Sequence, residues 1–254
     1  MGPGVLPIFA RQERQLNMRE VRDTTGRFAL RPHYQPAELD RECEAMLTQF
    51  FMPRHGEIPT PILTDDLTRL IERDVSDFDP GADLSEYGAD VEGVTEFRPG
   101  SKPRVRIAGE LAYDERRENR YRTTLTHEYG HVHFHGYLFA LEPRSGDFFQ
   151  PKGRNALQIC KRETIIDARS ADWMEWQAGY ICGAILMPIT HVRKVVASFR
   201  KTESLLGPIA ATSKEGLVLL AKMEEIFDVS QEAARIRLLK LGILGSDKTN
   251  NSLF

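Results

Sequence analysis

The stretch LTHEYGHVHFHG, residues 125–136, contains four of the chain's seven histidines and decides how the rest of the sequence is interpreted. In a helix, successive residues turn by about 100°, so His127, Glu128 and His131 share one face. Apolar side chains lie on the opposite face, where they can join a core. The pattern therefore predicts an amphipathic helix with one apolar side and one side able to bind a metal ion.

The spacing of the first two histidines is typical of a zinc site. Histidines at i and i+4 can place ring nitrogens on one zinc ion at about 2.0–2.1 Å each. His127 and His131 have this spacing, and Glu128 between them can act as general base toward a water molecule beside the metal. His133 points away, and His135 lies about 12 Å along the axis from His127, beyond the same ion. We interpret His135 as a packed or solvated histidine, with a hydrogen-bonding role beside the ligands as the alternative.

A catalytic zinc site takes three protein ligands and leaves one position open. A second helix is predicted from Asp172 to Met187, where Pro188 stops it. Glu175 lies on its less apolar side, close in angle to small residues such as Ala178 that would permit close packing. We therefore interpret Glu175 as the third ligand rather than as an exposed carboxylate. Asp172 is the competing candidate, although its position is also typical of an N-cap.

The remaining pattern predicts an α+β fold with a small antiparallel or mixed sheet beside the histidine helix. VEGVTEF at 91–97 and PRVRIAGEL at 103–111 alternate apolar and polar residues, and the turn RPGSKP between them favours a hairpin. Asp65 is a candidate cap for a short helix. A further strand is expected at about 156–160, and the main helices are expected at 36–51, 118–137, 172–187 and within 189–244.

The C-terminal part has the outline of a helix-turn-helix, with a turn at residues 228–230 and Ser230 capping the second helix. Arg235, Arg237 and Lys240 could meet phosphates. Nearby acidic residues offset these charges, and no basic arm flanks the unit. We therefore expect a helical subdomain that packs on the rest of the chain and shapes the substrate cleft, not a DNA reader.

Composition narrows the class of protein. The 254 residues carry a formal net charge of −3, which gives no overall attraction to nucleic acid. The three cysteines, Cys43, Cys160 and Cys182, include no CxxC pair and fit free thiols in a reducing compartment. No apolar run approaches the length of a membrane span, and the N-terminus lacks the pattern of a signal peptide. We expect a cytoplasmic protein.

The histidine stretch at 125–136 and the segment around Glu175 resemble those of the ImmA/IrrE family of zinc metallo-endopeptidases, and the resemblance covers about residues 36–244. The resemblance implies a gluzincin-like peptidase core, with zinc on His127, His131 and Glu175 and with Glu128 as catalytic base. It also implies a specific protein substrate, often a helix-turn-helix repressor encoded nearby. The matching stretches are RYRTTLTHEYGHVHFH, CKRETI, EWQAGYICGAILMP and FDVSQEAARIRLLKLGIL.

Two positions depart from the family pattern. Gly179 stands where members often have Asn, so the hydrogen-bond partner of a ligand histidine is open. Tyr129 replaces an aliphatic residue, and we expect it to be tolerated on the core face.

The predicted division of the chain is a flexible tail at 1–35, a metallopeptidase domain at 36–188, a helix-turn-helix-like subdomain at 189–246 and a tail at 247–254. The hairpin is expected to offer an edge strand to an extended peptide. Tyr113, Tyr121, Tyr137 and His191 are open candidates for stabilising an oxyanion. The alternative function is a DNA-binding transcriptional regulator with a metal-sensing or inactive peptidase domain.

Overall fold

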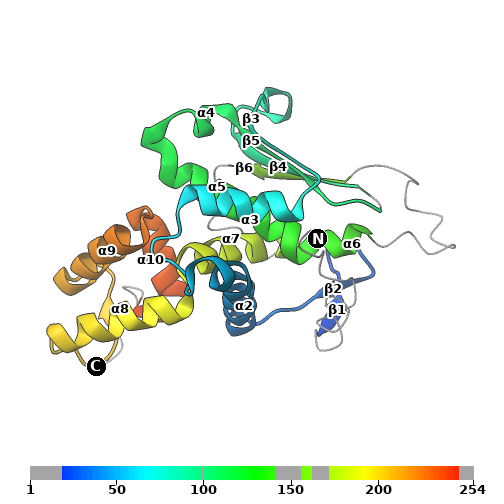
Figure 1. Cartoon of the computed structure of the whole chain (residues 1–254). Helices are drawn as coiled ribbons and strands as arrows, with labels where there is room; N and C mark the ends of the chain where they lie inside the picture. Colours follow the sequence, from blue (N-terminus) through cyan, green and yellow to red (C-terminus); the bar gives the residue numbers. More distant parts are fainter. Residues whose placement is uncertain (1–18, 99, 141–155, 162–171, 246–254) are drawn as a thin grey trace.

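The computed structural model describes residues 19–98, 100–140, 156–161 and 172–245, and in this part of the chain a mixed sheet covers a layer of helices (Figure 1). The sheet has the order β3-β5-β4-β6, with β3 parallel to β5 and the other pairs antiparallel. This arrangement confirms the predicted α+β class. The strands of this sheet are β3 (Asp77–Ala82), β4 (Val91–Phe97), β5 (Arg104–Ala108) and β6 (Ala156–Lys161).

The histidine helix lies between the sheet and α7, and α2 packs on α7 from the other side (Figure 1). None of the described helices is by itself long and apolar enough to cross a membrane, and α7 with α8 passes such a test only as a pair bent by 60°. The helices are α2 (Pro36–His55), α3 (Thr64–Asp74), α4 (Gly109–Ala112), α5 (Glu118–Gly130), α6 (Gly136–Ala140), α7 (Trp173–Leu186), α8 (Ile189–Thr202), α9 (Lys214–Phe227) and α10 (Gln231–Lys240).

The predicted histidine helix is present, but its middle is not α-helical. The α5 geometry ends at Gly130, residues His131–His135 form a π-helical turn, and α6 continues the segment. A π turn has i→i+5 hydrogen bonds and is wider than an α turn, so it changes the angle between side chains four residues apart. The periodicity of 3.6 used to place His135 therefore does not hold across this turn.

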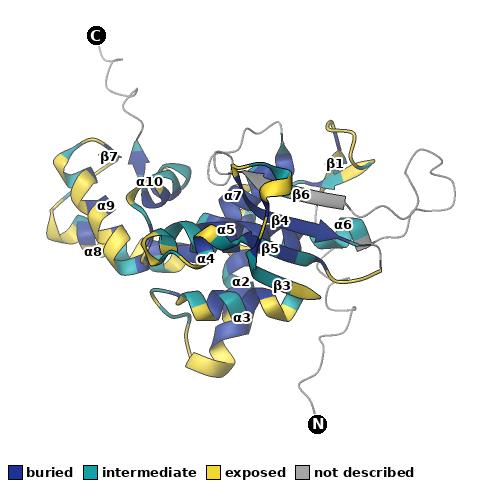
Figure 2. Ribbon diagram, turned by 90° about the horizontal axis from the view of Figure 1, so that it is seen from above, coloured by how far each residue is buried: buried dark blue, intermediate teal, exposed yellow. Residues whose placement is uncertain are grey.

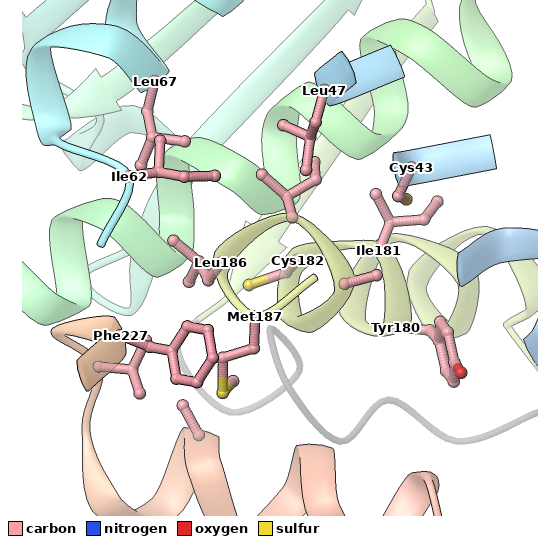
Figure 3. Packing of buried hydrophobic residues seen from close by; sticks show 14 of the residues in the cluster. Cys43, Leu47, Ile62, Leu67, Tyr180, Ile181, Cys182, Leu186, Met187 and Phe227 are labelled. Atoms are coloured by element: carbon pink, nitrogen blue, oxygen red, sulfur yellow. The ribbon is translucent and has the colours of Figure 1, made fainter. Parts of the chain in front are cut away.

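One hydrophobic core extends from α2 to the last strand, β8 (Leu244–Gly245), which pairs with β7 (Ile209–Ala210). Figure 3 shows side chains of α2, α7 and α9 meeting in this core, among them Leu47, Ile181 and Phe227. Burial is concentrated in β4, α5 and α7, whereas α8 and α9 expose their outer faces (Figure 2). The core includes residues on both sides of residue 188, and the boundary there remains a prediction.

A buried ion pair fastens the C-terminal helices to this core. Arg237 on α10 is 2 % exposed and donates to Asp40 of α2 at 2.5 Å and to the carbonyl of Met187 at 3.1 Å. The hydroxyl of Tyr180 on α7 donates to the second oxygen of Asp40 at 2.7 Å. The prediction that Arg237 could meet DNA phosphates is therefore wrong, because its side chain is committed to the interior.

The N-terminal prediction is wrong for residues 19–35. β1 (Glu20–Arg22) and β2 (Leu30–Pro32) form an antiparallel hairpin in this segment, and residues 1–18 lie outside the described part. The predicted tail at 247–254 also lies outside it. The composition of this segment is typical of a loose tail. The contacts that order the hairpin come from the start of α7, which is distant in sequence, so composition alone could not predict them.

Smaller predictions have mixed outcomes. The strand near 156–160 is β6, and Ser230 caps α10 by accepting from the backbone of Ala233 at 3.2 Å. Asp65 is not a cap, because α3 begins one residue earlier and Leu63 occupies the cap position. The hairpin β4–β5 does form, but both strands are internal, so it does not offer an edge strand; β3 and β6 are the end strands.

We predict that Arg237→Met lowers the free energy of unfolding by about 3–5 kcal/mol, because it leaves the Asp40 carboxylate buried without its cation. Urea denaturation of the full chain measures this. Arg235→Met is the matched control, because among the described residues Arg235 forms an exposed ion pair with Glu232, and its loss should cost less than about 1 kcal/mol. Equal losses in the two variants would contradict the structural role given to Arg237.

Candidate metal centre

Close packing of α5 on α7 creates the centre. A Cβ atom added to Gly130 would lie 3.3 Å from the Cα of Ala178 and 3.4 Å from the side chain of Ile181, so the backbones approach closely at this point. One turn earlier on α5, the hydroxyl of Thr126 lies 3.2 Å from the Cys182 sulfur. The small residues of α7 therefore act as expected and bring its N-terminal turn, which carries Glu175, to the histidines.

The structure brings His127, His131 and Glu175 together as the sequence predicts. The Nε2 atoms of the two histidines lie 3.2 Å apart, and they lie 3.1 Å and 3.2 Å from the two Glu175 oxygens. One ligand atom from each residue lies within 4.8 Å of the others, and all three side chains are buried. This group can hold a metal ion.

Asp172, the competing ligand, lies outside the cluster. Its carboxylate accepts from the backbone nitrogen of Glu175 at 3.5 Å, as an N-cap does, and pairs with Arg27 at 2.6 Å. The cap fixes the first turn of α7 and so helps to place the Glu175 side chain.

The charge of Glu175 suits a metal ligand. Burial by itself raises the pKa of this carboxyl, but the charges and hydrogen bonds of His131 and His127 outweigh burial and hold the pKa below its ordinary value. The group is therefore a carboxylate at neutral pH. An anionic oxygen beside two imidazole nitrogens is a donor set that divalent cations accept.

Glu128 lies next to the cluster, against strand β4. The hydroxyl of Thr95 donates to its Oε2 at 2.5 Å, whereas Oε1 is buried and has no hydrogen-bond partner among the described residues. A Cβ atom on Gly93 would lie 2.5 Å from Oε1, so this position has room for the carboxylate only because it is glycine. Burial raises the pKa of Glu128, although both ligand histidines oppose the shift.

His135 and Gln177 complete the surroundings of the ligands. Nδ1 of His135 lies 3.1 Å from Nδ1 of His131, and its Nε2 lies 3.0 Å from the Gln177 side-chain oxygen. Burial lowers the pKa of His135 to about 3, so the ring is neutral. Of the roles considered for His135, the structure supports hydrogen bonding beside a ligand. Gln177 and Thr95 were missed by sequence reasoning; the signal for Thr95 is that it shares a strand face with Gly93.

The four candidates for stabilising an oxyanion are not members of this cluster. The Tyr113 side chain is 81 % exposed, and the His191 ring is hydrogen-bonded to the Thr60 hydroxyl at 2.6 Å. Burial raises the pKa of Tyr121 and of Tyr137, which keeps both phenols protonated. The residue that would stabilise an oxyanion is not singled out by these positions.

Neither a protein-family model, nor a curated protein, nor a solved structure matches this chain. The likeness to the ImmA/IrrE family therefore stays a prediction from the sequence. The geometry of the cluster and the chemistry of its side chains are what indicate a function for this chain.

We predict that the purified chain binds a divalent metal ion and that His131→Ala and Glu175→Gln each lose most of it, because each removes one of three ligands. Metal analysis after gel filtration measures the bound ion. His133→Ala is the matched control, since His133 is on the same helix but faces Asp74, with Nδ1 3.8 Å from its carboxylate. Equal metal content in all three variants would contradict the assignment of the ligands.

Proposed function

We propose that this chain is a zinc-dependent endopeptidase of the gluzincin type, similar to the ImmA/IrrE family. The observation that carries the proposal is the convergence of His127, His131 and Glu175 in one buried cluster, with the separate buried carboxylate of Glu128 beside it. A purely structural metal site has no need of the second carboxylate. A hydrolytic site needs it as a base.

The cluster offers two imidazole nitrogens and a carboxylate, a donor set that zinc accepts. Ligand atoms at about 2.0–2.1 Å from a tetrahedral zinc ion lie about 3.3 Å from one another. The Nε2 atoms of His127 and His131 lie 3.2 Å apart, close to this value, and each lies 3.1–3.2 Å from a different oxygen of Glu175. Three protein ligands leave a fourth position for water or substrate, as in catalytic zinc sites.

When bound, zinc supplies Lewis acidity that polarises a peptide carbonyl and makes a water molecule more acidic. Glu128 has the two properties required of the base. Within the described residues its Oε1 has no hydrogen-bond partner and can accept a proton from water, while Thr95 holds Oε2 and fixes the plane of the carboxylate. A pKa raised by burial lets the protonated Oε1 then deliver its proton to the leaving amine.

An extended peptide has one strand beside the site on which to pair. β4 carries Gly93 and Thr95 against Glu128, and β6 is the neighbour of β4 at the end of the sheet. Backbone pairing with an edge strand such as β6 would bind a substrate largely independently of its side chains. We propose a specific regulatory protein as substrate, such as a helix-turn-helix repressor encoded nearby, and a cytoplasmic site of action.

The alternative, a DNA-binding regulator, loses one of its three candidate contacts. Arg237 is buried against Asp40 and cannot reach a phosphate. Its helix α10 packs on α7 rather than standing free. No observation specifically favours this alternative.

We predict that Glu128→Gln lowers peptide-bond cleavage at least about 100-fold while zinc content stays unchanged, because only the proton acceptor is removed. The measurement compares cells that express the wild type or the variant, with new protein N-termini identified by mass spectrometry. Glu118→Gln is the matched control, since Glu118 is an exposed carboxylate on the same helix.

Gly93→Ala offers a second variant for the same measurement. The added methyl group must displace the Glu128 carboxylate, so cleavage should fall while zinc remains bound. Cleavage products that persist unchanged in a zinc-loaded Glu128→Gln protein would contradict the proposed function.

A further inference from the structure

His135 is a fully buried histidine that belongs to neither the ligands nor the base. Its ring joins His131 on one side and Gln177 on the other, at 3.1 Å and 3.0 Å. The Gln177 side chain continues to the backbone carbonyl of Pro32 at 3.3 Å. Four groups thus form a single hydrogen-bonded line from the metal cluster to the N-terminal hairpin.

The Pro32 carbonyl, which ends this hydrogen-bonded line, determines the position of every proton in the line. A backbone carbonyl can only accept, so Gln177 must donate its Nε2–H to Pro32 and present its oxygen to His135. The amide oxygen can only accept as well, so His135 carries its proton on Nε2. Its Nδ1 is then the acceptor, and His131 must donate from Nδ1.

Hydrogen bonds running in the opposite direction cannot be satisfied at the Pro32 carbonyl. If His135 were protonated on Nδ1, its Nε2 would need a donor, and the Gln177 amide would have to turn over. The amide oxygen would then face the Pro32 carbonyl, and two buried acceptors would oppose each other. Only the first direction satisfies all members of the line.

We propose that Gln177 and the Pro32 carbonyl, acting through His135, keep the proton of His131 on Nδ1 and so reserve its Nε2 for the metal. His135 and Gln177 are positioning residues in this scheme, and the hairpin β1–β2 is a structural part of the metal site. The inference rests on the proposed metal site and not on peptide cleavage.

The hairpin is held firmly enough to serve as such an anchor. The indole nitrogen of Trp173 donates to Asp23 at 3.1 Å, and Arg27 pairs with Asp172 at 2.6 Å. The Trp173 ring also packs edge-on against the His135 ring, with 5.4 Å between their centroids. The start of α7 therefore contacts the hairpin, the positioning histidine and, through Glu175, the metal ligands.

The test uses full-length variants and zinc as the probe. Partners that orient metal-bound histidines affect affinity by about 10–100-fold. Gln177→Met and His135→Phe should therefore weaken zinc binding about 10–100-fold in competition with a chelator. His133→Phe, the matched control, should not change the affinity.

A second readout does not depend on affinity or on the folding of any variant. Long-range ¹H–¹⁵N spectra of the wild-type imidazoles should show His135 protonated on Nε2 and His131 protonated on Nδ1. His135 protonated on Nδ1 would overturn the proposal, as would wild-type zinc affinity in well-folded Gln177→Met and His135→Phe. If the wild type binds no zinc, the proposed peptidase fails, whereas the spectra still decide the direction of the line.

Discussion

The close approach of two helix backbones at Gly130 and Ala178 is the constraint on which the site depends. A larger residue at either position would separate α5 from α7. Glu175 would then move away from His127 and His131, and the only carboxylate of the cluster would be lost. The sheet above and α2 below press the two helices together, so the fold as a whole maintains this distance.

The same packing removes water from several ionisable groups at once. His127, His131 and Glu128 are fully buried, and Glu175 is 6 % exposed. Burying charges is costly unless they are paired or bind a metal. The histidines partly offset the charge of Glu175, and a bound cation would complete this compensation. The Oε1 atom of Glu128 remains without a hydrogen-bond partner in the described part of the chain, and in an enzyme this is the atom that takes up a proton.

The local part of the site could be predicted from the sequence, and the long-range part could not. Helical periodicity placed His127 and His131 on one face, and small residues on α7 indicated which side of that helix faces α5 and hence the role of Glu175. His135 is buried beside His131 and outside the ligand group, within the roles expected for it, although a π turn forms there. Thr95 and the Pro32 carbonyl reach the site through sheet and hairpin packing, which depends on residues far apart in the chain. The strand order was missed for the same reason, since β3 pairs with β5 and β6 pairs with β4, and both pairings join strands far apart in the sequence.

X-ray absorption of the zinc-loaded chain tests the central claim most directly. If His127, His131 and Glu175 bind the ion, two imidazole nitrogens and a carboxylate oxygen are expected at about 2.0–2.1 Å from it, and the spectrum should change in Glu175→Gln. Sulfur at about 2.3 Å would point to cysteine ligands. That result, or a spectrum unaffected by loss of Glu175, would contradict the account.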